Sequence, residues 1–171
     1  DAFFTLLNEY RFTVDDVKRV LIRLPEDGAR IVNNRSMPDV NAQHILSVAL
    51  VDGYIDFDNS HSYERMSDPV VAAVREKVEL VADPDLVVTD APRSGFVEIT
   101  LVDGRKFSLF VRHAPGTPEN PLSTEQVNAK ARALMVPVLG EKNTEAVIER
   151  VNNLELLDNI RELPPLLSNL S

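Results

Sequence analysis

The stretch FVEITLVDGRKFSLFV, residues 96–111, decides the fold class of this 171-residue chain. Successive side chains of a strand point to opposite faces, so an apolar residue at every second position indicates a strand with one buried face. Apolar residues recur in this way at Val97, Ile99, Leu101, Phe107, Leu109 and Val111. Asp103 and Gly104 lie between the two runs, and an Asp-Gly pair there is typical of a two-residue hairpin. We therefore predict antiparallel strands at 96–102 and 105–112.

Two further strands complete the predicted sheet. The alternation of Val20, Ile22 and Leu24 predicts a strand at 17–24, and another is expected at 78–82, before Pro84. A short β segment is also predicted from Ala29 to Val32. With helices between and after the strands, the pattern indicates an α+β domain with a small, mostly antiparallel sheet covered by helices on one face.

Apolar spacing and capping residues predict helices at 1–10, 37–53, 68–77, 124–136 and 143–151. Ser123 with Gln126 three residues later fits a capping box. The connections are a mixed segment at 53–67, a loop at 83–95, a Pro/Gly-rich loop at 112–121 and short helical turns at 154–170. Within them we interpret PGTPENPLS, residues 115–123, as a simple connection to the following helix and not as a recognition loop.

The helix predicted at 37–53, MPDVNAQHILSVALVDG, carries an unusual number of polar groups in its first half. Ser36 is the expected N-cap, Pro38 fits the first turn and Gly53 is the expected left-handed terminator. Apolar residues cover more than half of the circumference, at Ala42, Ile45, Leu46, Val48, Ala49 and Leu50. Asn41, His44 and Ser47 share the remaining stripe. This stripe is the candidate functional surface.

Composition limits the classes of partner. The chain has 27 acidic and 18 basic residues, a net charge of −9, and no Lys/Arg cluster, which argues against nucleic acid and anionic membranes as partners. There is no cysteine, so thiolate chemistry is excluded and a cytoplasmic location is favoured. No apolar run reaches the roughly 20 residues that span a bilayer. The first residue is Asp1, which suggests a fragment or a processed chain.

Several stretches in this order resemble the C-terminal domain of the MmgE/PrpD family, whose members include 2-methylcitrate dehydratase, cis-aconitate decarboxylase and iminodisuccinate epimerase. The stretches are AFFTLLNEY, FTVDDVKRVLIRLP, NAQHILSVALVDG, SDPVVAAVREKVEL, VEITLVDGRKF and PGTPENPLSTEQVNAKARAL. None of them is diagnostic alone, and the resemblance covers nearly the whole chain.

The resemblance implies an arrangement that this chain supplies only in part. Family members have a larger helical N-terminal domain and a smaller α+β lid, with the active site in the cleft between them. Residues 1–12 would then be the final helix of, or linker from, that missing domain, and residues 13–171 the lid. The implied chemistry needs no cofactor: a proton is removed α to a carboxylate of a small di- or tricarboxylate, followed by loss of water or carbon dioxide, or by reprotonation. The whole protein would be a homodimer, and the chain alone inactive.

The resemblance points to one site residue, and the residues around the helix start suggest two more. His44 matches the position at which the decarboxylase branch has a lid tyrosine, and a histidine there can donate or accept a proton near neutral pH. Arg35 beside the helix start is a candidate carboxylate ligand, and Asn41 a candidate substrate-binding residue. The competing interpretation makes His44 a hydrogen-bonded core or interface residue and Arg35 a solvated one.

The other polar candidates receive structural interpretations. Gln43 is expected to face water, and Asp52 to end the helix. His61 and His113 are expected to be structural or solvated, because their spacing makes no metal site with Asp or Glu.

Two alternative functions stay open at this stage. The chain could be a free-standing module that holds a small acid at the N-terminus of the 37–53 helix without chemistry. Alternatively, the polar stripe could form an interdomain or dimer contact.

Overall fold

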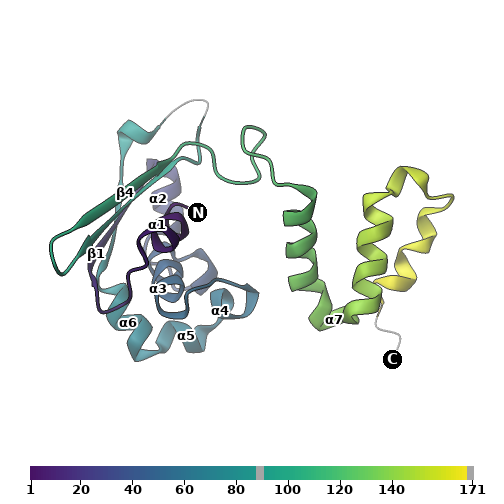
Figure 1. Cartoon of the computed structure of the whole chain (residues 1–171), viewed down its shortest axis with the longest axis horizontal. Coiled ribbons are helices and arrows are strands. Elements are labelled where there is room, and N and C mark those ends of the chain that lie inside the picture. The colour runs from purple at the N-terminus through teal and green to yellow at the C-terminus, as the bar shows by residue number, and fades with distance from the viewer. Residues whose placement is uncertain (88–90, 169–171) are drawn as a thin grey trace. The chain divides into compact units, whose positions relative to one another are not determined.

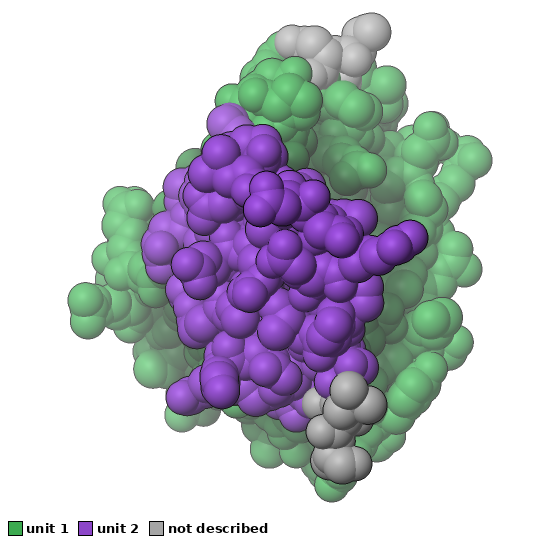
Figure 2. Space-filling view, turned by 90° about the vertical axis from the view of Figure 1, so that its right-hand side faces the viewer, with its two compact units in different colours: residues 1–120 green, residues 121–171 purple. Residues whose placement is uncertain are grey.

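The computed structural model describes residues 1–87 and 91–168. The chain divides into two compact units, residues 1–120 and 121–171, which Figure 2 colours separately. The predicted loop at 83–95 and the predicted turns at 154–170 each extend into residues that lie outside the described part.

The first unit contains a four-stranded sheet in the order β2-β1-β3-β4. Its strands are β1 (Val17–Leu24), β2 (Val78–Ala82), β3 (Gly95–Leu101) and β4 (Lys106–Val111). β1 pairs with β2 in parallel and with β3 antiparallel, and β3 pairs with β4 antiparallel. The predicted α+β class and mostly antiparallel sheet are therefore confirmed, with strand boundaries within two residues of the prediction.

Helices cover one face of this sheet, as Figure 1 shows for α1 (Ala2–Tyr10) and α3 (Ala42–Asp52). α1 contacts β3 and β4, whereas α3 contacts β2 and α6 (Pro69–Arg75). The strand residues that alternate toward these helices are buried, and include Val17, Val20, Ile22, Val97, Ile99 and Leu101. The period-2 pattern in the sequence thus marks the core face.

The predicted β segment at 29–32 is wrong, because residues Glu26–Val32 form a helix, α2. Two acidic residues, Glu26 and Asp27, lie in its first turn, where the helix dipole favours negative charge. Arg30 forms an i,i+4 ion pair with Glu26 at 2.6 Å. The following linker then leads to the next helical segment.

The helix predicted at 37–53 is shorter than expected. Residues Pro38–Val40 form a separate 3₁₀ turn, η1, and the α-helix begins only at Ala42. Its N-cap is Asn41 and not Ser36, because the side chain of Asn41 accepts a hydrogen bond from the backbone N–H of His44. The end is confirmed, since Gly53 has the left-handed φ of 78°.

Short helices fill the segment after Gly53. They are α4 (Phe57–His61) and α5 (Tyr63–Ser67), with Asp56 and Ser62 as their N-caps. The helix predicted at 68–77 is α6, which has Asp68 as its N-cap and Pro69 at its first position. A 3₁₀ turn, η2 (Pro84–Leu86), follows β2.

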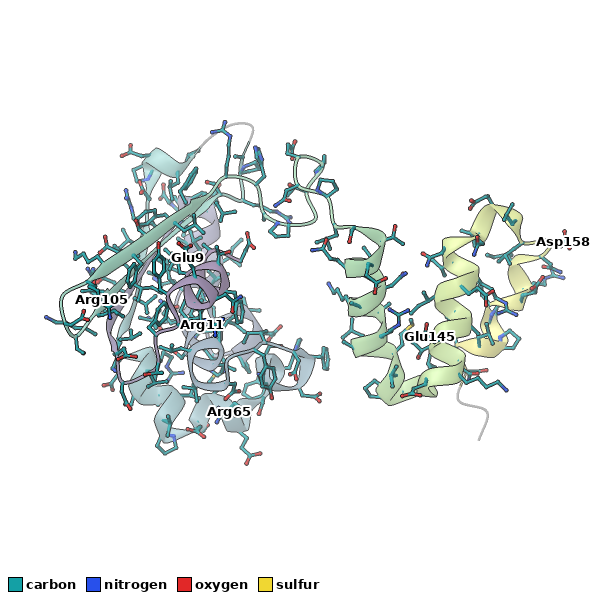
Figure 3. The ribbon with its side chains drawn as sticks, viewed as in Figure 1. Glu9, Arg11, Arg65, Arg105, Glu145 and Asp158 are labelled. Carbon is teal, nitrogen blue, oxygen red and sulfur yellow. The ribbon has the colours of Figure 1, made fainter. Side chains whose placement is uncertain are left out.

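The second unit is helical. Its long element α7 (Thr124–Asn152) is two helices joined at Gly140, whose φ of 75° and ψ of 162° are not helical, so the two predicted helices are confirmed. The capping box of Ser123 and Gln126 is present. Arg132 binds both carboxylate oxygens of Glu145, labelled in Figure 3, at 2.6 and 3.0 Å. Three 3₁₀ turns follow: η3 (Leu154–Leu156), η4 (Ile160–Glu162) and η5 (Pro164–Leu166).

Candidate functional site

The side-chain amide of Asn41 holds the start of α3 through two hydrogen bonds. Asn41 is 2% exposed; its Oδ1 accepts from the backbone N–H of His44 at 2.9 Å, and its Nδ2 donates to the backbone carbonyl of Arg35 at 2.6 Å. The first bond caps the helix and the second ties the preceding linker to it. Asn41 therefore fixes where His44 sits on α3.

Gln43 holds the same linker from the next position. Its Nε2 donates to Asn33 Oδ1 at 2.6 Å, and its Oε1 accepts from the backbone N–H of Asn34 at 3.0 Å. Asn34 adopts a left-handed φ of 47°, which turns the chain back toward α3. The prediction that Gln43 faces water is wrong, since the residue is only 2% exposed.

Arg35 lies beside this network and binds backbone. Its Nε donates to the carbonyl of Ile31 at 2.7 Å and its Nη2 to the carbonyl of Arg30 at 2.6 Å. These carbonyls belong to the last turn of α2, whose negative dipole end favours a cation. The side chain of Arg35 therefore caps the C-terminus of α2. It does not lie free at the N-terminus of the 37–53 helix, where it was expected as a carboxylate ligand.

His44 has a fully buried side chain without a hydrogen-bond partner. Its exposed fraction is 0%, and both ring nitrogens are unpartnered within the described residues. Neither open interpretation matches this, because His44 is neither at a surface nor a hydrogen-bonded core residue. A buried polar group left unpaired costs about 1–3 kcal/mol, so such a group calls for an explanation.

The surroundings of His44 disfavour the protonated form of its ring. Burial lowers the pKa of His44 from its ordinary value of 6.5, and the positive charges of Arg75 and Arg65 lower it further. The imidazole is therefore neutral near pH 7 and has one nitrogen able to donate and one able to accept a proton. An anion bound beside it would act in the opposite direction and raise its basicity.

Arg65, labelled in Figure 3, is held between two carboxylates. It pairs with Asp52 at the end of α3 and, at 2.6 Å, with Asp68 at the start of α6. Backbone N–H groups of Val71 and Val70 hold the pKa of Asp68 below its usual value, and Arg65 adds to this effect. Asp52 thus ends the helix, as predicted, and also anchors a cation near His44. Sequence spacing gave no signal for this cluster.

The polar stripe of α3 lies inside the first unit and not on its surface. Asn41, His44 and Ser47 are 2%, 0% and 0% exposed, and Ser47 Oγ donates to the carbonyl of Gln43 at 2.7 Å. The expectation that this stripe looks out of the domain is therefore wrong, and so is the interpretation of it as an interdomain or dimer surface. The stripe is polar because its side chains bond to backbone nearby, except at His44.

Comparison with known proteins decides the family. The family model for the MmgE/PrpD C-terminal domain matches residues 1–156. The chain belongs to the MmgE/PrpD family. It is 30% identical to the cis-aconitate decarboxylase of Mus musculus over 162 residues, which is 91% of this chain and 32% of that protein. It is also 30% identical to the cis-aconitate decarboxylase of Homo sapiens over 159 residues, 90% of this chain and 32% of that protein. The chain thus spans about a third of the length of these relatives.

The remaining histidines of this MmgE/PrpD domain lie on elements other than α3. The ring of His61 stacks on Phe57 at 4.1 Å, and its Nδ1 lies 2.8 Å from the carbonyl of Phe57. His113 Nδ1 lies 3.9 Å from Glu119 Oε2. Within residues 1–87 and 91–168, no group of three or more His, Asp or Glu side chains is arranged to hold a metal ion. No described helix is long and apolar enough to cross a membrane.

Replacing Asn41 tests its two roles in this MmgE/PrpD domain separately. Asn41→Ala should lower the free energy of unfolding by about 1–2 kcal/mol or more, since it removes the cap of α3. Asn41→Ser keeps a cap acceptor but loses the amide that donates to Arg35, so its loss should be smaller. Urea unfolding of the chain measures both. Equal losses for the two variants would mean that the helix cap contributes nothing.

The lowered pKa of His44 predicts a specific pH dependence of stability. In the unfolded chain His44 takes up a proton as the pH falls through about 6.5, whereas the folded chain resists protonation until a lower pH. The unfolded state therefore binds more protons in this window, and folding stability should fall as the pH is lowered. His44→Leu should lack this component. Urea unfolding from about pH 7.5 to 5.5 should show the two stabilities diverge; parallel curves would contradict the buried neutral imidazole.

Proposed function

We propose that this chain is the lid of a cofactor-independent lyase or isomerase that acts on small di- or tricarboxylates. Membership of the MmgE/PrpD family supports the lid assignment. The relatives named as cis-aconitate decarboxylase support a carboxylate substrate. The proposed reaction begins with removal of a proton α to a carboxylate, of the type catalysed in 2-methylcitrate dehydratase. Loss of water, loss of carbon dioxide or reprotonation would follow.

The observation that carries this proposal is the unpartnered, neutral imidazole of His44 beside two arginines. A neutral imidazole can accept a proton, and the positive charge of Arg75 favours an anion near it, whereas the charge of Arg65 is balanced by Asp52 and Asp68. Binding of a carboxylate would then raise the basicity of His44 when substrate is present. The proton would pass from the substrate carbon to a ring nitrogen of His44 and return from there to product or solvent.

This role requires that substrate reach a side chain that is now fully buried. The elements packed over α3 therefore have to move before the reaction, and α6 is one of them. We propose that Asn41 acts by holding the backbone of His44 in place, and that Arg35 holds the linker before it. Direct binding of substrate by these two residues, as the sequence suggested, would require it to replace the backbone contacts of Arg35 and Asn41.

The partners in this proposal are the protein's own helical N-terminal domain, which would complete the cleft, and a second copy in a homodimer. Both rest on the family resemblance. A cytoplasmic location rests on the absence of cysteine from the chain.

The test is an assay of the intact protein with a panel of acids: citrate, 2-methylcitrate, cis-aconitate and iminodisuccinate. Proton NMR in deuterium oxide follows both product formation and exchange of the hydrogen α to a carboxylate. We expect exchange with at least one acid, and no exchange when the 171-residue chain is used alone. Absence of exchange and of product across the panel would contradict the proposal.

The alternative of an acid-binding module at the N-terminus of α3 gains no support from the structure. Asn41 occupies the cap position, and Asn41 and Gln43 are each 2% exposed. A small acid would have to displace this buried network before it could bind the helix N-terminus.

A further inference from the structure

The first unit contains a pocket of about 370 Å³ at the end of the β3–β4 hairpin, remote in sequence from α3. The register pairs Gly95 with Val111, so the residues just before β3 and just after β4 meet at this end. The segment before β3 lines the pocket with Pro92 and Arg93, and the segment after β4 lines it with Arg112 and His113. No residue of α3 lines it. We name it the loop pocket.

The far wall of the loop pocket is a closed turn. Gly116 adopts φ 90°, a left-handed conformation that favours glycine, and its N–H donates to the carbonyl of Asn120 at 2.8 Å. The N–H of Asn120 in turn donates to the carbonyl of Thr117 at 3.1 Å, and its Nδ2 donates to the carbonyl of His113 at 3.0 Å. The segment predicted to be a simple connection therefore has a defined shape.

Two groups of the loop pocket lack protein partners. The hydroxyl of Thr117 is buried and has no hydrogen-bond partner within the described residues. Arg93 is exposed, and no hydrogen bond or ion pair engages its guanidinium in the part of the chain that the structure describes. A buried hydroxyl without a partner is destabilising, and an oxygen of a ligand would remove that penalty.

The charges of the lining select an anion. Arg93 and Arg112 line the pocket, and His113 lies 3.9 Å from the single carboxylate, Glu119, among the described lining residues. The whole chain carries a net charge of −9, so the guanidinium of Arg93 in the pocket wall, unpaired within the described residues, is a local departure from the overall sign. A guanidinium binds a carboxylate through two parallel hydrogen bonds, and one hydroxyl adds a third donor.

We propose that the loop pocket binds a small organic acid through one carboxylate, held by Arg93 and the hydroxyl of Thr117. Phosphate has about two negative charges and three strong acceptor oxygens, so it needs more donors than these two groups offer, and Glu119 would repel it more strongly than a single carboxylate. This inference does not rest on the proposed function, because it concerns binding by this chain alone.

The test is a titration of the ¹⁵N-labelled 171-residue chain with succinate, followed by amide NMR at constant ionic strength. We expect saturable shifts of the Gly116 and Thr117 amides, separate from any change at α3. Shifts confined to α3, or no shifts at all, would overturn the proposal. Inorganic phosphate and neutral succinamide are titrated in parallel. Tighter binding of phosphate at the same amides would overturn the carboxylate assignment, as would equal binding of succinamide.

Variants locate the contact. Arg93→Gln should weaken succinate binding about tenfold or more, because a charge-assisted hydrogen-bonding group is lost. Thr117→Val removes the hydroxyl at nearly constant shape and should weaken binding several-fold while the amide spectrum stays dispersed. The matched control is Arg105→Gln at the turn end of the same hairpin, labelled in Figure 3, where the side chain pairs with Asp103. Arg105→Gln should change the affinity less than about twofold. Unchanged affinity in both Arg93→Gln and Thr117→Val would overturn the proposal.

Discussion

Replacing His44 with leucine should make this chain more stable and the intact protein nearly inactive in the proposed reaction. Both ring nitrogens of His44 are buried and have no partner in the described part of the chain, so an apolar side chain of similar size removes a desolvation penalty without opening a cavity. We expect a gain of about 1–3 kcal/mol in the free energy of unfolding. Turnover of the intact protein in the proposed reaction should fall by about 10²–10⁴-fold, the usual contribution of a general acid or base. Replacing a group that destabilises the fold but serves function is expected to raise stability and lower activity.

A gain in stability together with a loss of activity distinguishes a catalytic role of His44 from a structural one. Replacing a residue that is needed only for packing would lower both the stability and the activity of the protein. Ser47→Ala is the matched control, because Ser47 is equally buried, lies one turn further along α3 and donates to the Gln43 carbonyl. It should lower stability by about 1 kcal/mol and leave turnover within a few-fold of the natural protein. Urea unfolding and the deuterium-exchange assay measure the two quantities. Full turnover in His44→Leu would remove His44 from the reaction.

The sheet was predictable because its signals are local. The period-2 pattern around Asp103–Gly104 fixes the pairing of β3 with β4, and the same pattern in β1 identifies its buried face. The parallel pairing of β1 with β2 is different in kind, because it brings together residues about 60 positions apart, such as Val20 and Val78. Neither β1 nor β2 has a sequence feature that predicts which strand it pairs with.

The predictions of secondary structure were wrong where two local signals in the sequence competed. Ala29 to Val32 contains two β-branched residues, which favour a strand, but Pro25 and the acidic first turn start a helix ahead of them. At the next helix, Ser36 and Pro38 together resemble a capped helix start, yet Pro38 begins a separate 3₁₀ turn whose N-cap residue is Met37. An Asn side chain three residues before the N–H of His44 was the available signal for the true cap.

The candidate site was predictable only in its central residue. Helical periodicity placed Asn41 and His44 on one stripe, and the structure joins them through a hydrogen bond. The burial of His44 and its neighbours Arg65 and Arg75 follow from how α5 and α6 pack near α3, which no spacing encodes. A sequence therefore identifies a reactive side chain more readily than the environment that sets its pKa.

Phe3→Ala should lower the free energy of unfolding of the first unit by about 3–5 kcal/mol, which is the usual cost of emptying a buried aromatic site. Phe3 is 2% exposed, and its ring packs edge-on against Phe4 at 5.9 Å and Phe12 at 6.2 Å. Tyr10, at the other end of α1, stacks on Phe107 of β4 at 3.8 Å. The sequence suggested that residues 1–12 end or follow a missing domain, and that division stays a prediction. The packing shows that α1 also forms part of the core of the sheet.

The measurement is urea unfolding followed through the amide signals of β3, which α1 contacts directly. Phe57→Ala on α4 is the matched control, since it makes the same deletion at a side chain that is 57% exposed, and it should cost about 1 kcal/mol or less. Since small domains are stable by only about 5–15 kcal/mol, Phe3→Ala should leave a substantial fraction of this unit unfolded at moderate temperature. Equal losses for the two variants would show that α1 does not belong to the core of the sheet. A large loss for Phe3→Ala alone would mean that the lid needs its first helix to fold, whatever precedes that helix in the intact protein.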